Sequence, residues 1–418
     1  MIHSTDFIQK FAQQPTHFPN TMNHHYHFFL LGGALFILLT LWVSRFAARF
    51  GVPSLLATLA LGMAFGNGGP FDFDYNYPSI TLHISEIALS IIIFTGGLET
   101  RWKSVQPVLW QGISLASLGV LLTMMSIGFL AHWWLHWDWI PALLMGALVS
   151  ATDAAAVFSI LENIRIKLVP GVREVLELES GANDPMAFFL TISLTTLLIP
   201  GGDQDGWAGI LGHFLQSMVV GLGTGLLAGK FIHLFLKRIP LKKGQFPIVL
   251  LAWVVILYAV NSLLGGSAFL AVYVTGIILG NSPWGQRELN LHFFESMAWL
   301  METGLFLVLG LQVYLRQLPE VLWEGLLISA GLMLLARPVS VWVSLALFRG
   351  ISAQKKNFYA WVGLRGATPI VFALIPVVAG VPYADKMFNI AFIVVITSIL
   401  FQGATVRWMA ELTGVRKQ

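Results

Sequence analysis

Long apolar runs separated by short polar segments dominate the chain. Thirteen of these runs are predicted to cross a membrane as helices. About 20 residues span the hydrocarbon layer, and somewhat fewer suffice where a helix is buried in protein. The predicted spans are residues 27–44, 52–66, 84–98, 107–131, 139–161, 176–199, 207–229, 246–264, 268–281, 293–313, 321–347, 357–379 and 387–406. The pattern predicts an all-α polytopic membrane protein.

The basic residues between the runs alternate as the positive-inside rule requires. If the N-terminus lies outside, 19 of the 24 Lys and Arg residues fall on the cytoplasmic side. The external side then holds Lys10, Arg316 and Lys386, while Arg337 and Arg365 lie inside apolar runs. This asymmetry predicts an external N-terminus and a cytoplasmic C-terminus in a cell (inner) membrane.

An odd number of spans with a connecting seventh helix suggests two six-helix units of opposite orientation. The predicted parts are an external tail (1–25), a first unit (26–200), a linking helix with a basic cytoplasmic loop (201–245), a second unit (246–410) and a short cytoplasmic tail (411–418). The fifth span contains Ala151-Thr152-Asp153, and the twelfth, its counterpart, contains Ala367-Thr368-Pro369. Inverted repeats with broken helices crossing near the midplane are typical of secondary transporters.

The composition agrees with a membrane protein and excludes some kinds of site. Hydrophobic residues make up 56% of the 418 residues and charged residues 11%, whereas soluble domains carry about 25% charged residues. The chain has no cysteine, which excludes disulfides and thiolate metal sites. We expect no cofactor and no nucleic-acid partner; the lipid bilayer is the expected environment.

The most polar stretch within an apolar region is residues 177–186. Glu179 and Asn183 are four residues apart and share a helix face, and Asp184 lies about 100° further round on the same half of the helix. Pro185 has no N–H to donate, which leaves the carbonyl of Gly181 free. Carboxylates, an amide and a free carbonyl suit a small cation or a proton.

An ionised carboxylate inside a membrane is costly and marks a functional site by default. The alternative for this stretch is a loop followed by a helix N-terminus, where acidic residues favour the helix dipole. That alternative explains Glu174 and Glu177 well, but it explains Asp184 poorly because apolar sequence continues beyond it.

Two further apolar spans contain ionisable residues beside helix-breaking ones. Asp153 lies in the middle of the fifth span, where Ser150 and Thr152 can satisfy backbone groups if the helix opens. Arg365 lies among glycines and a proline, Gly363-Leu364-Arg365-Gly366-Ala367-Thr368-Pro369, which predicts a second broken helix. The alternative is a proline kink whose arginine reaches the membrane interface.

Arg337 lies deep in the eleventh span and is followed by Pro338. A buried unpaired charge is strongly destabilising, so Arg337 needs an anion. Glu179 is the predicted partner.

Taken in order, these segments resemble the NhaP-like branch of the monovalent cation/proton antiporters. The matching segments are 94–99 (Phe-Thr-Gly-Gly-Leu-Glu), 151–153, 179–185 (Glu-Ser-Gly-Ala-Asn-Asp-Pro), 337–338 and 363–367. The sequence of residues 179–187 is similar to that of the potassium/proton antiporter subgroup, which is also linked to cell-volume regulation. The chain departs from the family pattern at Thr95, where Asp is more frequent, and at Ala154, where Pro is common.

The resemblance implies a role for each residue. Asp184 alternately binds a cation and a proton, Thr152 and Asp153 line the site with it, and Asn183 supports them. Glu179 pairs with Arg337, and Ser180 and Arg365 support the core. The resemblance also implies a homodimer in which a six-helix core domain moves against a dimerisation domain.

The predicted function is exchange of K⁺ and/or Na⁺ for H⁺. Burial disfavours an ionised carboxylate and a bound cation favours it, so proton and cation displace each other. Asn183 in place of a second acid favours electroneutral exchange. The alternatives are a cation channel or uniporter, and an intramembrane aspartyl protease, whose Tyr-Asp and Gly-x-Gly-Asp motifs are not met; we therefore expect no enzyme. Oxygen ligands of these types accept both ions, so the residues leave the choice between K⁺ and Na⁺ open.

Overall fold

The computed structural model describes residues 31, 33–43, 45–46, 53–163, 166–201, 206–283 and 287–416. Within these ranges the chain is helical and contains no strand, and Leu168 and Arg416 form an isolated β-bridge. The predicted external tail, residues 1–25, lies outside the described residues. The named helices are α3 (Ser54–Phe65), α4 (Pro78–Glu99), α5 (Trp102–Val105), α6 (Leu109–Ser114), α7 (Val120–Leu135), α8 (Trp139–Leu148), α9 (Ala154–Asn163), α10 (Val172–Leu198), α11 (Gly206–Arg238), α12 (Gln245–Leu263), α13 (Ala268–Gly280), α14 (Arg287–Gln312), α15 (Leu322–Gly331), α16 (Arg337–Ser344), α17 (Ala353–Trp361), α18 (Thr368–Ala379), α19 (Ala384–Thr397) and α20 (Gly403–Leu412).

Every predicted span overlaps helical residues, which confirms the all-α polytopic class. Within the described ranges, seven helical segments are long and apolar enough to cross a membrane: Pro78–Glu99, Trp102–Leu135, Ala208–Arg238, Gln245–Leu263, Arg287–Gln312, Leu315–Ser344 and Ala384–Leu412. The other predicted spans coincide with shorter apolar helices or, in α10, with a long helix that carries several charges. The exact number of crossings stays a prediction.

Local sequence explains several helix ends. Pro78 is the first residue of α4, a position that needs no N–H and suits the fixed φ of proline. The helix therefore begins earlier than residue 84, which is the start predicted from hydropathy alone. Gly380 ends α18 in the left-handed conformation at φ 66°, which glycine adopts without a steric penalty.

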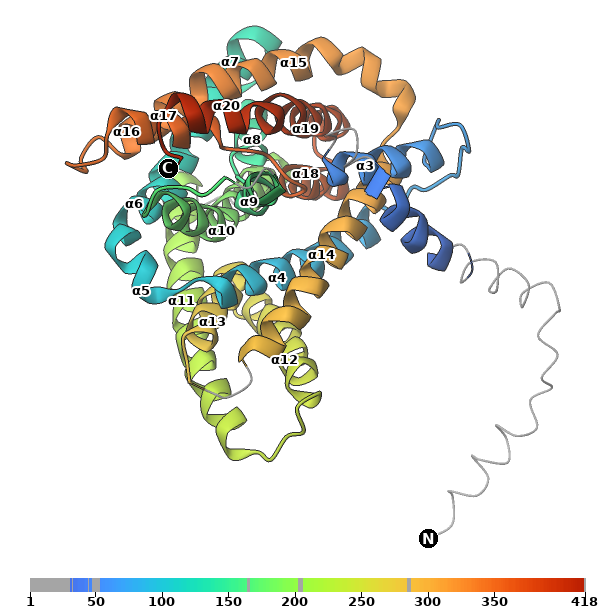
Figure 1. Ribbon diagram of the computed structural model, residues 1–418. Coiled ribbons are helices and arrows are strands. Elements are labelled where there is room, and N and C mark those ends of the chain that lie inside the picture. Colours follow the sequence, from blue (N-terminus) through green and yellow to red (C-terminus); the bar gives the residue numbers. More distant parts are fainter. Residues whose placement is uncertain are drawn as a thin grey trace, which may run out of the picture.

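The helices form two groups, and each group combines distant parts of the chain (Figure 1). In one group α3 and α4 pack on α14, and α13 packs on α4 and α11. In the other, α10 packs on α6, α8 and α18, while α15 packs on α19 and α16 packs on α17. Each group therefore draws helices from both of the predicted units, 26–200 and 246–410.

Glycines allow the backbones of the first group to approach closely. A Cβ atom on Gly62 of α3 would overlap the backbone of α14 at Leu307 and Gly310. A Cβ atom on Gly97 of α4 would likewise overlap α13 at Tyr273 and Gly276. Small residues at helix contacts permit the van der Waals packing that drives helix association in membranes.

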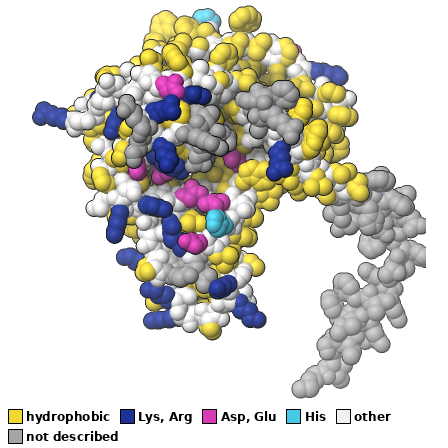
Figure 2. All heavy atoms as spheres, viewed as in Figure 1, with side chains coloured by type: hydrophobic (Ala, Val, Ile, Leu, Met, Phe, Trp, Pro, Cys, Tyr) yellow, Lys and Arg dark blue, Asp and Glu magenta, His cyan; other side chains and the backbone are white. Residues whose placement is uncertain are grey.

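Apolar side chains gather over the upper part of the visible face and its right side (Figure 2). Large hydrophobic side chains are exposed along α11, among them Leu215, Val219 and Leu227. Basic side chains gather at the lower end of the view, where the loop between α11 and α12 lies. An apolar surface of this extent is typical of contact with lipid rather than with water.

Both predicted helix breaks are present, and they cross each other. Residues 149–153 are not helical between α8 and α9, and neither are residues 362–367 between α17 and α18. The backbone N–H of Asp153 donates a hydrogen bond to the carbonyl of Leu364, with a distance of 2.8 Å between N and O. This hydrogen bond joins the two breaks directly inside the protein.

Candidate functional site

α10 places three of the predicted site residues in the protein interior. Glu179, Asn183 and Asp184 are all buried on this helix, which continues through Pro185 without interruption. At the start of the helix, the Glu174 carboxylate accepts a hydrogen bond from the N–H of Gly171 at 2.8 Å. The interpretation as a helix N-terminus thus holds for Glu174 and is wrong for Asp184, which lies in the middle of α10.

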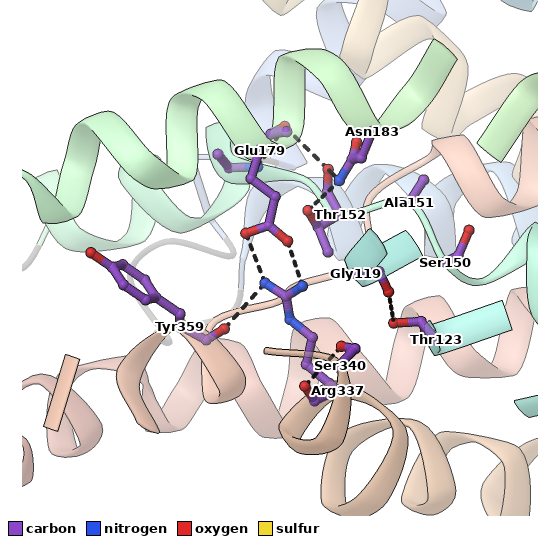
Figure 3. A network of polar contacts seen from close by, with 12 residues as sticks. Gly119, Thr123, Ser150, Ala151, Thr152, Glu179, Asn183, Arg337, Ser340 and Tyr359 are labelled. Atoms are coloured by element: carbon purple, nitrogen blue, oxygen red, sulfur yellow. Dashed lines mark hydrogen bonds and ion pairs between the residues drawn. The ribbon is translucent and has the colours of Figure 1, made fainter. Parts of the chain in front are cut away.

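The polar face of α10 holds the first break in position (Figure 3). The side-chain amide of Asn183 donates to the Thr152 hydroxyl at 2.5 Å. The Ser180 hydroxyl donates to the Thr152 carbonyl and accepts from the N–H of Ala154, both at 3.1 Å. These bonds satisfy backbone groups that a broken helix leaves without intrahelical partners.

Asp153 lies at the junction of the two breaks. Its carboxylate accepts a hydrogen bond from the N–H of Ala156 at 3.1 Å, in the first turn of α9. The neighbouring position on the second break is Gly366, where a Cβ atom would overlap the Asp153 carboxylate. The glycine leaves the space that this carboxylate occupies.

Arg365 is fully buried and binds backbone carbonyls of the first break. Its guanidinium donates to the carbonyls of Ser150 at 3.0 Å and Ala151 at 2.6 Å. Its own N–H donates to the Ser398 hydroxyl at 3.0 Å. Because the side chain is 0% exposed, the alternative that it reaches the membrane interface is excluded. The positive charge instead faces the negative end of a helix dipole.

Glu179 and Arg337 form a buried ion pair between α10 and α16 (Figure 3). Both guanidinium nitrogens engage the carboxylate, one of them at 2.9 Å from Oε2. The same nitrogen also donates to the Tyr359 carbonyl at 3.2 Å. A Cβ atom on Gly363 would overlap the Arg337 side chain. The pair thereby links α10 to the segment that precedes the second break.

A cavity of about 130 Å³ lies beside these residues. Its wall includes Thr152, Asp153, Ser180 and Asp184. Oδ1 of Asp184 is buried and has no hydrogen-bond partner among the described residues. Since one water occupies about 30 Å³ of liquid, this space can hold an alkali cation with part of its hydration shell.

The structure does not bring every predicted ligand to the cavity. Asn183 is fully buried behind Thr152 and is not part of the cavity wall. Its position is one of support rather than contact.

The opposite wall of the cavity contains residues that were not predicted as site residues from the sequence. Tyr273 of α13 and Glu302 of α14 line it, as does Glu99 at the end of α4. Glu302 could have been predicted as a site residue, because it is an acidic residue inside the apolar run 293–313. No sequence feature distinguishes Tyr273, since aromatic residues are common in apolar helices.

Comparison with protein families and known proteins extends these observations. The family described as "Sodium/hydrogen exchanger, transmembrane" matches residues 34–412. The chain is 39% identical over 387 residues to the K(+)/H(+) antiporter NhaP2 of Shewanella baltica, covering 93% of this chain and 67% of that protein. It is also 39% identical over 384 residues to the K(+)/H(+) antiporter NhaP of Alkalimonas amylolytica, covering 91% of this chain and 66% of the relative. The chain thus spans about two thirds of the length of these relatives.

The fold has a solved counterpart. The sodium proton antiporter MjNhaP1 from Methanocaldococcus jannaschii superimposes with a TM-score of 0.80 at 21% sequence identity. The match covers 91% of this chain and 97% of that one. At this level of identity the likeness establishes a shared fold.

Proposed function

The chain belongs to the sodium/hydrogen exchanger family, and from this membership we propose that it exchanges potassium for protons, with sodium also accepted, at the cavity beside Asp184. The family is one of transporters, and its members include potassium/proton and sodium/proton antiporters. The resemblance drawn from segments such as 151–153 and 179–185 is thereby confirmed, as is the antiporter fold. Cation/proton exchange is the activity, and the identity of the ion is the proposal.

One observation supports the proposed site above the others: the unpartnered carboxylate oxygen of Asp184, which lines a cavity in the middle of an apolar helix bundle. A buried charge without a partner is costly. A proton on Asp184 removes the charge, and a cation in the cavity balances it. The two ligands therefore exclude each other at one carboxylate.

The oxygen atoms around Asp184 suit an alkali cation as substrate. We infer that the carboxylates of Asp184 and Asp153 and the hydroxyl of Thr152 contact it, because hard cations prefer such ligands. Asn183, Ser180 and Arg365 keep the breaks in place, and the pair of Glu179 and Arg337 neutralises itself. None of these supporting residues needs to change charge during exchange.

The proposed exchange is electroneutral, with one charge moving in each direction. The residue before Asp184 is Asn183 rather than a second acid, which supports a single exchanged charge. We also propose a homodimer in the cell inner membrane, with the N-terminus outside. The basic residues at the loop between α11 and α12 support this orientation by the positive-inside rule.

Proton movement in proteoliposomes tests the proposal. A pH-sensitive dye is quenched by an imposed proton gradient, and K⁺, Na⁺ or Li⁺ is then added. We expect K⁺ and Na⁺ to dissipate the gradient in the wild type. Asp184→Asn should abolish the response while the purified protein keeps its fold, because the variant keeps the volume and loses the charge.

Several outcomes would contradict the proposal. Wild-type exchange rates in folded Asp184→Asn would remove this residue from the site. A response to Na⁺ and Li⁺ without any to K⁺ would refute the potassium assignment alone. Cation flux that proceeds without coupled proton movement would favour the channel or uniporter alternative.

A further inference from the structure

We propose that Glu302 of α14 is a further carboxylate that binds the transported cation, directly or through a water molecule, from the wall of the cavity opposite Asp184. This inference rests on the proposed function and assigns a further residue to its site. Glu302 lines the same cavity as Asp153 and Asp184. The charges of Glu302 and Asp153 interact electrostatically, as do those of Asp153 and Asp184. The three acids thus line one cavity.

The three acids come from separate elements. Asp184 is on α10, and Asp153 is in the break between α8 and α9, which α10 holds by hydrogen bonds. Glu302 is on α14, which packs on α3 and α4. The carboxylates of Asp184 and Asp153 in the group that contains α10 are thus opposed by a carboxylate from the group that contains α14.

Glu302 has no ion-pair partner in the part of the chain that the structure describes. Among the described residues, no ion pair or side-chain hydrogen bond involves its carboxylate. Of the buried arginines, Arg337 is paired with Glu179, and Arg365 donates through one nitrogen to the carbonyls of Ser150 and Ala151 in the first break. Like-charged carboxylates that share a site repel each other unless a proton or a cation intervenes. A cation in the cavity is the counter-charge that this arrangement lacks.

The geometry also limits what Glu302 does. The described residues contain no cluster of three acidic or histidine side chains close enough to ligate one metal ion together. Glu302 therefore does not complete a single ligand shell with Asp153 and Asp184. It attracts the cation across the cavity, directly or through a water molecule. Glu302 therefore increases the affinity for the cation and takes no part in the exchange step itself.

Glu302→Gln tests this role, because it removes the charge and retains the shape. In proteoliposomes we expect the KM for K⁺ to rise about tenfold or more, because the variant removes a favourable electrostatic interaction with the cation. The maximal rate should change less than about twofold, since Asp184 is intact. Glu302→Asp should restore most of the affinity. The matched control is Glu295→Gln on the same helix, where Glu295 is exposed and pairs with His292; its KM should equal that of the wild type.

The results separate this inference from the proposed function. If the wild type exchanges cations for protons and folded Glu302→Gln keeps the wild-type KM, the role of Glu302 is refuted and the function stands. Equal losses in Glu302→Gln and Glu302→Asp, accompanied by a lowered Tm in both, would identify Glu302 as structural and also refute it. Absence of exchange in the wild type would refute the proposed function and this inference with it.

Discussion

At the scale of single residues, two kinds of buried carboxylate lie on α10. Glu179 is 2% exposed and bidentate with Arg337, so its charge is balanced inside the protein. Asp184 is 8% exposed, and one of its oxygens lacks a donor in the described part of the chain. Because a buried charge needs a partner, the first residue is suited to a constant structural role. Asp184 is suited to bind a ligand reversibly.

The pairing of Glu179 with Arg337 predicts a strong coupling between their substitutions. Glu179→Ala and Arg337→Ala should each lower the free energy of unfolding by about 3–5 kcal/mol, because each leaves a buried charge alone. The double variant should lose much less than the sum of the two. Unfolding of all four proteins in one detergent, followed as a double-mutant cycle, measures this coupling.

An exposed pair on the same helix serves as the control. Arg173 and Glu177 are separated by 2.7 Å, with side chains 49% and 23% exposed. Arg173→Ala should cost about 1 kcal/mol or less, as exposed ion pairs do. Additive losses for Glu179→Ala and Arg337→Ala would show that their pairing does not stabilise the fold.

At the scale of elements, the two broken helices depend on side chains from other helices. A helix end leaves carbonyl and N–H groups without partners, and water cannot satisfy them inside a membrane. In the first break, Arg365 satisfies the carbonyls of Ser150 and Ala151, and Ser180 satisfies the N–H of Ala154. On the second break, the Gln402 amide donates to the Trp361 carbonyl at 2.7 Å. Each break is thus held by a residue of the last helix of its own predicted unit.

Short π-helical turns support the predicted correspondence between the two units. They occur at residues 115–119 and 332–336, within the fourth span of each unit, and at 398–402. π-helical turns are rare and concentrate at functional sites. The last of them contains Ser398 and Gln402, which contact the second break. The inverted repeat itself stays a hypothesis.

The close contact between the breaks predicts that Gly366→Ala will impair exchange. The new Cβ atom would overlap the Asp153 carboxylate, so the carboxylate must move away from the position it holds in the cavity. We expect the exchange rate to fall about tenfold or more, with a loss of stability of about 1–3 kcal/mol from overpacking. Gly304→Ala on α14 is the control, since no atom lies within 4 Å of its added Cβ. Wild-type exchange in Gly366→Ala would show that the site tolerates a displaced Asp153.

At the scale of the whole molecule, the cavity lies where the two helix groups meet. One wall comes from α4, α13 and α14, and the other from α10, α18 and the break before α9. A relative movement of the groups would change which residues face the cation and how the cavity opens. The family resemblance implies such a movement of a six-helix core. Because acids lie on both walls, such a movement would change the distance between the carboxylates that face the cation.

Competition at Asp184 predicts how exchange depends on pH. As the pH falls, protons occupy the carboxylate and the cation must displace them, so the apparent KM for K⁺ should rise. In the range where the protonated form dominates, the rise approaches about tenfold per pH unit, while the maximal rate at saturating K⁺ changes little. Initial rates measured with equal pH on both sides, over about three pH units, test this expectation. A KM that does not change with pH would contradict competition at a single carboxylate.

Features that depend on a local pattern could be predicted from the order of the amino acids alone. Hydropathy located the helical spans, and glycine, proline and polar residues located both breaks. The four-residue spacing placed Glu179 and Asn183 on one face of α10, because helix geometry fixes which positions share a face. The motifs around Asp153, Asp184 and Arg365 identified the family without any structural information.

Only the tertiary structure decided which distant groups meet. It showed that Arg365 binds carbonyls of the first break rather than reaching the membrane interface, that Asn183 lies behind the cavity wall, and that Glu302 lies on the wall opposite Asp184. It also showed that each helix group combines both predicted units. Hydropathy and spacing are properties of a few neighbouring residues. The position of one helix against another depends on how surfaces far apart in the chain pack, and no local pattern encodes that arrangement directly.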